Sequence, residues 1–195
     1  MCHLKDITQK KKNQQKIEYQ AHNDVLTGLY NRMKCELDLP KEIKRTIQNN
    51  KKGAILFIDL DNFKHINDGL GHRHGDMLLQ QIASGLQSMM NLKDHCYRMG
   101  GDEFVIVVTY ENFDDMDRIV KNIIEMFNTP WDLSGTEYYC TMSMGIAVYP
   151  DDSIDYNELI RLADIAMYDS KKSGKNRYCY YDGKGGNKTE KRLDI

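Results

Sequence analysis

The chain is 195 residues long, of which 41% are apolar and 29% are charged. This composition is typical of a globular domain with a hydrophobic core. The 27 Lys and Arg residues against 29 Asp and Glu residues give a formal net charge of -2, which argues against a broad basic surface for nucleic acids or membranes. The longest apolar runs, 54–58 and 104–108, are too short to span a bilayer, and the first residues show no signal-peptide pattern.

The apolar pattern predicts alternating strands and helices between a polar beginning and a polar end. Residues 1–22 indicate an exposed linker helix, residues 23–182 a single domain, and the Gly-rich, charged residues 183–195 a mobile tail or linker. Within the domain we expect, in chain order, a strand at 54–60, a helix at 76–90, strands at 95–99 and 103–109 joined as a hairpin, a helix at 113–127, a strand at 138–148, a helix at 156–172 and a strand at 178–181. This order favours an α+β sheet covered by helices.

The five cysteines are scattered along the chain without a CxxC pair. This distribution argues against a zinc site or a disulfide framework, and it fits free thiols in a reducing cytoplasm. The cysteines are Cys2, Cys35, Cys96, Cys140 and Cys179.

Two acidic clusters are the first candidates for chemistry. Asp59-Leu-Asp61 ends the apolar strand, and Asp102-Glu103 lies in the hairpin turn after two glycines. Carboxylate oxygens beside a backbone that can approach a phosphate suit Mg²⁺, which keeps water and phosphate oxygens in its shell. The alternative for either cluster taken alone is a group of solvated turn residues.

The segment from Asp59 to Asp76 adds a cation, amides and imidazoles. A carboxylate such as Asp76, with Asn67, could pair with the N–H donors of guanine and would leave buried groups unpaired with adenine. The alternative is an exposed loop in which His72 and His74 have no ligand. The cations at the end of the last predicted helix, Lys171 to Arg177, could clamp a polyphosphate or simply stabilise a helix C-terminus.

Five motifs in register resemble the GGDEF domains of bacterial diguanylate cyclases. They are Asp24-Val-Leu-Thr-Gly-Leu-Tyr-Asn-Arg32, Phe57-Ile-Asp-Leu-Asp-Asn-Phe-Lys64, Arg98-Met-Gly-Gly-Asp-Glu-Phe104, Ser143-Met-Gly-Ile-Ala147 and Ala163-Asp-Ile-Ala-Met-Tyr168. The resemblance runs from about Asp24 to Tyr181. It implies a nucleotide-cyclase or polymerase-palm-like mixed sheet surrounded by helices, with the GGDEF residues on a β-hairpin.

The resemblance also implies an activity and a metal site. The activity is the condensation of two GTP molecules into cyclic di-GMP and two pyrophosphates by a homodimer that depends on Mg²⁺ or Mn²⁺. Asp59, the Leu60 carbonyl, Asp102 and Glu103 match the metal site, and Asp102 is the expected aid to deprotonation of the attacking hydroxyl.

The substrate contacts implied by the resemblance lie in three other segments. They are Gly100 and Gly101 along the phosphates, Asn67, Asp76 and His72 on the guanine side, and Lys64, Lys171 and Lys175 as phosphate cations. Where this chain has Lys175 the family often has Arg, so the charge is kept but the bidentate fork is lost.

A second departure concerns the product-inhibition site of the family, Arg-x-x-Asp. Here the stretch is Asn91-Leu-Lys-Asp94, so only the aspartate remains and we expect no strong product inhibition. The chain ends resemble the exit of a PAS sensor domain and the lead into an EAL phosphodiesterase domain. These similarities suggest a cytoplasmic fragment of a larger sensor protein that could be membrane-anchored. The alternative function is a GTP-binding regulatory module that controls an adjacent EAL domain.

Overall fold

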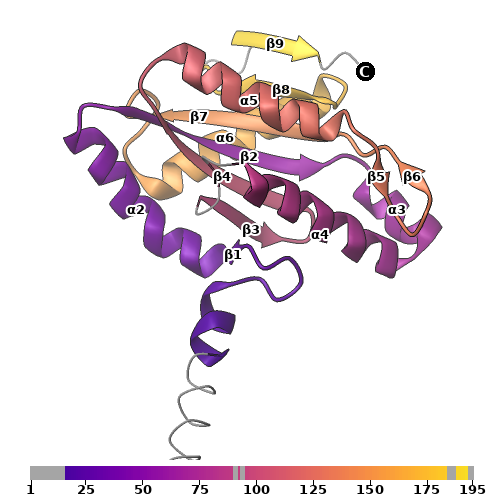
Figure 1. The fold of residues 1–195 in the computed structure, drawn as a ribbon. Helices are drawn as coiled ribbons and strands as arrows, with labels where there is room; N and C mark the ends of the chain where they lie inside the picture. Colours follow the sequence, from indigo (N-terminus) through magenta and orange to yellow (C-terminus); the bar gives the residue numbers. More distant parts are fainter. Residues whose placement is uncertain (1–15, 90–91, 93–94, 184–187, 193–195) are drawn as a thin grey trace, which may run out of the picture.

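The computed structural model describes residues 16–89, 92, 95–183 and 188–192, which form a mixed sheet with helices on both faces (Figure 1). The sheet has seven strands in the order β1-β3-β4-β2-β7-β8-β9. The pairs β1–β3 and β7–β8 are parallel and the other neighbours are antiparallel. The strands are β1 Tyr30–Asn31, β2 Lys52–Leu60, β3 Cys96–Gly100, β4 Glu103–Tyr110, β7 Met142–Tyr149, β8 Arg177–Tyr180 and β9 Lys188–Arg192.

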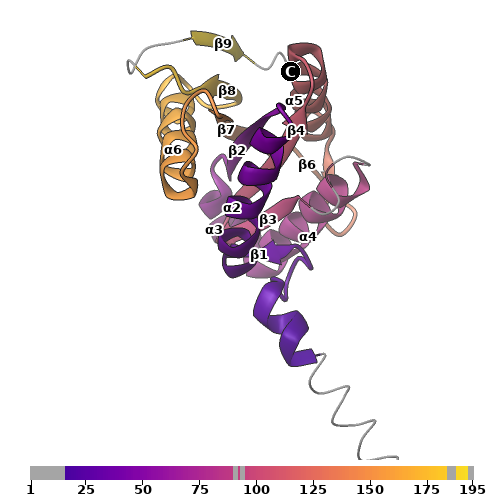
Figure 2. The ribbon, with the colours of Figure 1, turned by 90° about the vertical axis from the view of Figure 1, so that its left-hand side faces the viewer.

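The helices cover the two faces of this sheet as separate layers (Figure 2). Helices α2 (Arg32–Gln48) and α6 (Tyr156–Lys172) pack on one face, and α4 (His72–Ser88) and α5 (Phe113–Phe127) pack on the other. The short helix α3 (Phe63–Leu70) follows β2 directly, and a small hairpin of β5 (Trp131–Asp132) and β6 (Glu137–Tyr138) lies outside the main sheet. The predicted α+β class is confirmed.

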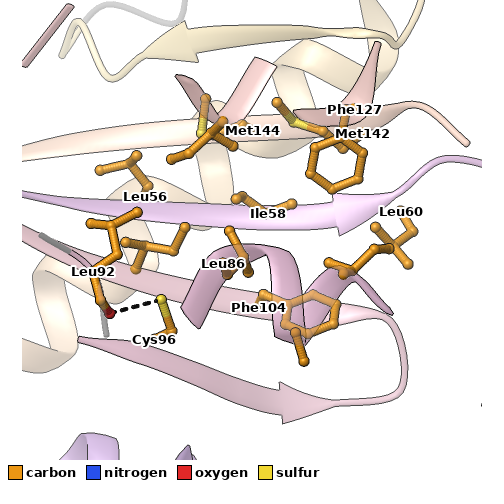
Figure 3. Packing of buried hydrophobic residues seen from close by; sticks show 14 of the residues in the cluster. Leu56, Ile58, Leu60, Leu86, Leu92, Cys96, Phe104, Phe127, Met142 and Met144 are labelled. Atoms are coloured by element: carbon orange, nitrogen blue, oxygen red, sulfur yellow. Dashed lines mark hydrogen bonds between the residues drawn. The ribbon is translucent and has the colours of Figure 1, made fainter. Parts of the chain in front are cut away.

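Strand β2 is central because its side chains alternate between two apolar layers. Ile55 and Phe57 face the layer under α2 and α6, whereas Leu56, Ile58 and Leu60 face the layer under α4 and α5. Figure 3 shows the second layer, in which Leu56, Ile58 and Leu60 belong to the same apolar cluster as Leu86 and Phe127. This burial on both faces fixes the end of β2, where the first acidic cluster begins.

The helices predicted at 113–127 and 156–172 have the same bounds in the structure, because a capping residue directly precedes the first residue of each helix. The Asn112 side chain accepts a hydrogen bond from the Asp115 amide (3.0 Å), and Asp155 accepts one from the Glu158 amide (2.9 Å). The predicted strand at 138–148 is wrong in extent: the structure breaks it into β6 and β7.

Four further segments differ from the prediction. Helix α2 and helix α3 were not predicted, and α4 begins at His72 instead of Asp76. The region 59–76 is rich in Asn, Asp, Gly and His and resembles a loop in sequence, but Gly71 joins the two helices with a φ of +87° that a side chain would disfavour. Residues 188–192, in the segment expected to be a mobile tail, form β9 beside β8.

The cysteines of the described residues are free, and all of them are buried, a placement that the sequence left open. They are Cys35, Cys96, Cys140 and Cys179. Cys2 lies outside the described residues.

Candidate active site

The end of β2 and the turn between β3 and β4 bring the two acidic clusters together. Asp59 pairs with Glu103 across the β2–β4 ladder, and the Leu60 amide donates a hydrogen bond to the Asp102 carbonyl at 3.3 Å. The carboxylates that the sequence separates by more than forty positions therefore share one end of the sheet. Their role as metal ligands stays a prediction.

The environment of these carboxylates disfavours their charged form. Asp59 is only 8% exposed, and burial raises its pKa above the ordinary value; the Lys171 ammonium, 2.8 Å from Asp59 Oδ2, acts in the opposite direction. Burial also raises the pKa of Glu103, and the nearby Asp59 and Asp164 charges add to the effect. The cluster thus holds more negative charge than Lys171 neutralises, which favours a bound cation.

The glycines of the turn are required by the backbone. Gly100 has a φ of +138° and Gly101 a φ of +54°, which side chains disfavour. A Cβ added at either position would meet nothing within 4 Å. The backbone beside the carboxylates is therefore bare and accessible, as a phosphate contact would require.

An arginine network holds this turn, and its role was missed in the sequence. Arg98 donates from Nε and Nη2 to the Gly101 carbonyl, at 3.1 and 2.7 Å, and from Nη1 to Asp24 at 2.8 Å. Burial works against the charge of Asp24, but hydrogen bonds from Thr27 and Arg98 hold its pKa below the ordinary value. The only sequence signal was the presence of Asp24 and Arg98 in the family motifs.

Asp61, the second aspartate of the first cluster, is occupied by structural contacts. It is 5% exposed and accepts hydrogen bonds from the Thr141 and Ser143 hydroxyls, both at 2.7 Å, and from the Asn176 amide at 2.9 Å. It thereby ties the end of β2 to β7 and to the segment between α6 and β8. Asp59, in contrast, bonds a single lysine in the described contacts.

Helices α3 and α4 carry the predicted guanine contacts. Gly75 packs against Asn67, since a Cβ at Gly75 would lie 2.0 Å from Asn67 Oδ1, and Asp76 follows directly. Asp76, His72 and Lys64 are exposed, and Asn67 is half-buried. These side chains are available to a ligand, and their contacts with guanine or phosphate stay predictions.

The two lysines of the last helix and its following turn reach back to the end of β2. Lys171 bonds Asp59, and the Lys175 ammonium donates to Asn62 Oδ1 at 2.6 Å. Lys175 and Asn176 both have positive φ, at +62° and +49°. The structure therefore places two predicted phosphate cations close to the acidic cluster. Asn91 and Asp94, of the predicted product-inhibition stretch, lie outside the described residues.

The donor atoms suit Mg²⁺. Within the described ranges no group of three or more His, Cys, Asp and Glu side chains has the arrangement of a metal centre. Two carboxylates and a backbone carbonyl, completed by water and phosphate oxygens, are nevertheless the usual protein share of a nucleotide-bound Mg²⁺. The all-oxygen donors and the incompletely neutralised charge at Asp59 and Glu103 fit that ion.

Comparisons with known proteins agree with this geometry. The family model described as "Diguanylate cyclase, GGDEF domain" matches residues 21–177. The bifunctional diguanylate cyclase/cyclic di-GMP phosphodiesterase MucR of Pseudomonas aeruginosa is 34% identical over 94% of this chain and 27% of its own length. The cyclic di-GMP phosphodiesterase PdeR of Escherichia coli is 33% identical over 93% of the chain and 27% of its own length. This chain thus spans about a quarter of each of these relatives.

Among solved structures, the GGDEF domain of TpbB from Pseudomonas aeruginosa superposes with a TM-score of 0.79. It is 34% identical, and the match covers 84% of this chain and 96% of that one. Among the helices that the structure describes, none combines the length and apolar character needed to cross a membrane. The motifs, the palm-like mixed sheet and these similarities show that the chain belongs to the GGDEF domain family of diguanylate cyclases.

Proposed function

We propose that this domain is an active diguanylate cyclase that joins two GTP molecules into cyclic di-GMP and releases two pyrophosphates. The observation that carries this proposal is the meeting of Asp59 with Asp102 and Glu103 beside the bare Gly100-Gly101 backbone. An intact acidic site is expected of an enzyme, because charge clustering of this kind costs folding free energy and needs a functional reason.

Asp59, the Leu60 carbonyl, Asp102 and Glu103 would hold Mg²⁺ or Mn²⁺. The bound ion would lower the pKa of the ribose 3′-hydroxyl and neutralise charge that develops on the α-phosphate. The preference for GTP would come from Asn67 and Asp76, with His72 as a further contact.

The residues of the chain itself position the triphosphate and move a proton. Lys171 and Lys175 already lie at the end of β2 and would attract the phosphates, with Lys64 on α3 as a third cation. Asp102 would accept the proton of the 3′-hydroxyl. The 3′-oxygen then bonds to the α-phosphorus of the other GTP, and the bond to pyrophosphate breaks in line with it.

Ring closure requires the same reaction twice, with the roles of the two GTP molecules exchanged. We propose that two copies of the domain meet face to face and that each contributes one GTP. The rate per domain should then rise with protein concentration until the dimer is saturated.

The test is a mass-spectrometric assay of cyclic di-GMP formed from GTP and Mg²⁺ at several protein concentrations. Asp59→Asn and Asp102→Asn should each lower the rate at least about a hundredfold, which is roughly the effect of removing one group that stabilises the transition-state charge. Glu137→Gln, which removes an exposed carboxylate on β6, should keep the parent rate. If either aspartate variant keeps the parent rate, the proposal is wrong.

The similarity to a protein named as a phosphodiesterase supports a second candidate, a GTP-binding regulatory module next to an EAL domain. Such a module would bind GTP and Mg²⁺ without forming product even when two copies are linked. A covalently dimerised protein in the same assay separates the two functions, because only the cyclase turns over. We also propose that PAS and EAL domains flank this segment in a longer protein, since the matched relatives extend well beyond it.

A further inference from the structure

A cavity lies at the opposite end of the sheet from the carboxylates. It has a volume of about 570 Å³ and lies where β2 begins and where β4, β7 and β8 end. Lys52 lines it, and Asp59 follows seven residues later on β2, roughly 23 Å away at the rise of an extended strand. The cavity is therefore separate from the proposed GTP site.

The walls of the cavity are largely aromatic. Tyr110, Phe113, Tyr180 and Tyr181 contribute four rings, and Met116 adds an apolar surface. The Phe113 and Tyr180 rings lie 6.3 Å apart between centroids, tilted by 32°. Phe113 is nevertheless 66% exposed at the start of α5, so this ring is available to contact a ligand.

The rim of the cavity is acidic. Glu111, Asp151 and Asp152 line it with Lys52 as the single cation among the lining residues. Lys52 is paired with Asp151, and Lys51, which lies outside the lining, is paired with Glu111 at 2.8 Å. Asp152 accepts a hydrogen bond from the Val148 amide at 2.6 Å. The negative potential is also felt by Tyr110, whose pKa is raised to about 12 by burial first and then by the Asp151 and Asp152 charges.

We propose that this cavity binds a small organic cation, an amine or guanidine with an aromatic or hydrocarbon body. The face of an aromatic ring attracts cations, and the carboxylates of the rim add to that attraction. A volume of this size matches sites for small molecules. The same charge repels phosphates, so a nucleotide is not the expected ligand.

The probe that tests this proposal is 2-phenylethylammonium, compared with 2-phenylethanol and 3-phenylpropionate, which have a similar body but no positive charge. Binding to the whole chain is measured by ligand-observed NMR and calorimetry. We expect the amine to bind with a Kd on the order of 1 mM or below and at least about tenfold tighter than either analogue, as a ligand of this size allows. The proposal is overturned if the three compounds bind with equal affinity. It is also overturned if the amine does not bind at 10 mM, which is on the order of ten times the expected Kd.

Two variants with opposite expected effects locate the site. Asp151→Asn should weaken amine binding about fivefold to tenfold, and Lys52→Met should strengthen it by a similar factor, because the two changes alter the rim charge in opposite directions. Both side chains are about half exposed, so the fold should tolerate either change. Phe113→Ala should weaken binding through loss of a ring, and Glu137→Gln should leave the affinity unchanged. The same affinity in Asp151→Asn, Lys52→Met and Phe113→Ala would place the amine elsewhere and refute the proposal.

Discussion

Replacement of Asp61 tests whether a buried carboxylate holds the active-site end of the sheet together. Its oxygens accept three hydrogen bonds, from Thr141, Ser143 and the Asn176 amide. Asp61→Ala removes the acceptor from all three donors. The Ser143 side chain is fully buried, so its hydroxyl cannot turn to bulk water, whereas Thr141 and Asn176 are half-buried and can recruit it.

The magnitude follows from these three contacts. A hydrogen bond to a charged group contributes about 1.5–3 kcal/mol, but water replaces part of this at Thr141 and Asn176, and removal of a buried charge returns its desolvation cost. We expect Asp61→Ala to lower the free energy of unfolding by about 3–4 kcal/mol. Asp61→Asn should cost only about 1–2 kcal/mol, because the amide oxygen can still accept from Thr141 and Asn176 while the amide nitrogen faces Ser143.

The assay is urea denaturation followed by circular dichroism, with the slope of the transition compared between variants. Asp68→Ala is the matched control: Asp68 is an exposed aspartate within α3, and its loss should change the free energy of unfolding by no more than about 0.5 kcal/mol. The reasoning is refuted if Asp61→Ala stays within about 1 kcal/mol of the parent, or if the alanine and asparagine variants are equally stable.

Three further variants test other contacts of the fold and the site. Glu103→Gln should gain stability relative to the parent as pH rises. Because the pKa of Glu103 is raised in the folded protein, its contribution to stability is fully present below the unfolded pKa of 4.5 and is lost as pH rises through the folded pKa. Thermal melting measured at several pH values would show this. Gly145→Ala should lower the free energy of unfolding by more than about 3 kcal/mol, because the new Cβ would lie 2.0 Å from the Ala163 carbonyl, and urea titration would measure this. Arg98→Lys keeps the charge but loses the fork that grips the Gly101 carbonyl, so we expect kcat to fall about tenfold with a smaller change in KM in the GTP assay.

The sequence predicted those elements whose signals are local. Helices α5 and α6 have capping residues and regular apolar spacing, and their bounds agree with the structure. Helix α2 has the same spacing, with Cys35, Leu39 and Ile43 buried at intervals of four residues. Its Pro40 and its many charged residues obscured the pattern, because a proline inside a helix usually marks a boundary.

The predicted site depended on family resemblance more than on residue chemistry. Asp59 and Asp61 are two residues apart in one acidic cluster, and their sequence neighbourhood alone does not separate a ligand from a structural acceptor. The difference comes from residues distant in the chain. The three donors to Asp61 are 80, 82 and 115 positions away, and only the folded sheet brings them to the end of β2.

The unequal neutralisation of these carboxylates is the physical reason to propose Asp59, and not Asp61, as a ligand of the expected metal ion. Asp61 accepts from two hydroxyls and a backbone amide, so three of the roughly four lone-pair sites of its carboxylate are already used in the folded protein. Asp59 has Lys171 as its partner and feels the charge of Asp102, and its pKa is raised by burial in spite of the lysine. A cation that enters between Asp59 and Asp102 would relieve this repulsion, whereas one at Asp61 would have to compete with three existing hydrogen bonds.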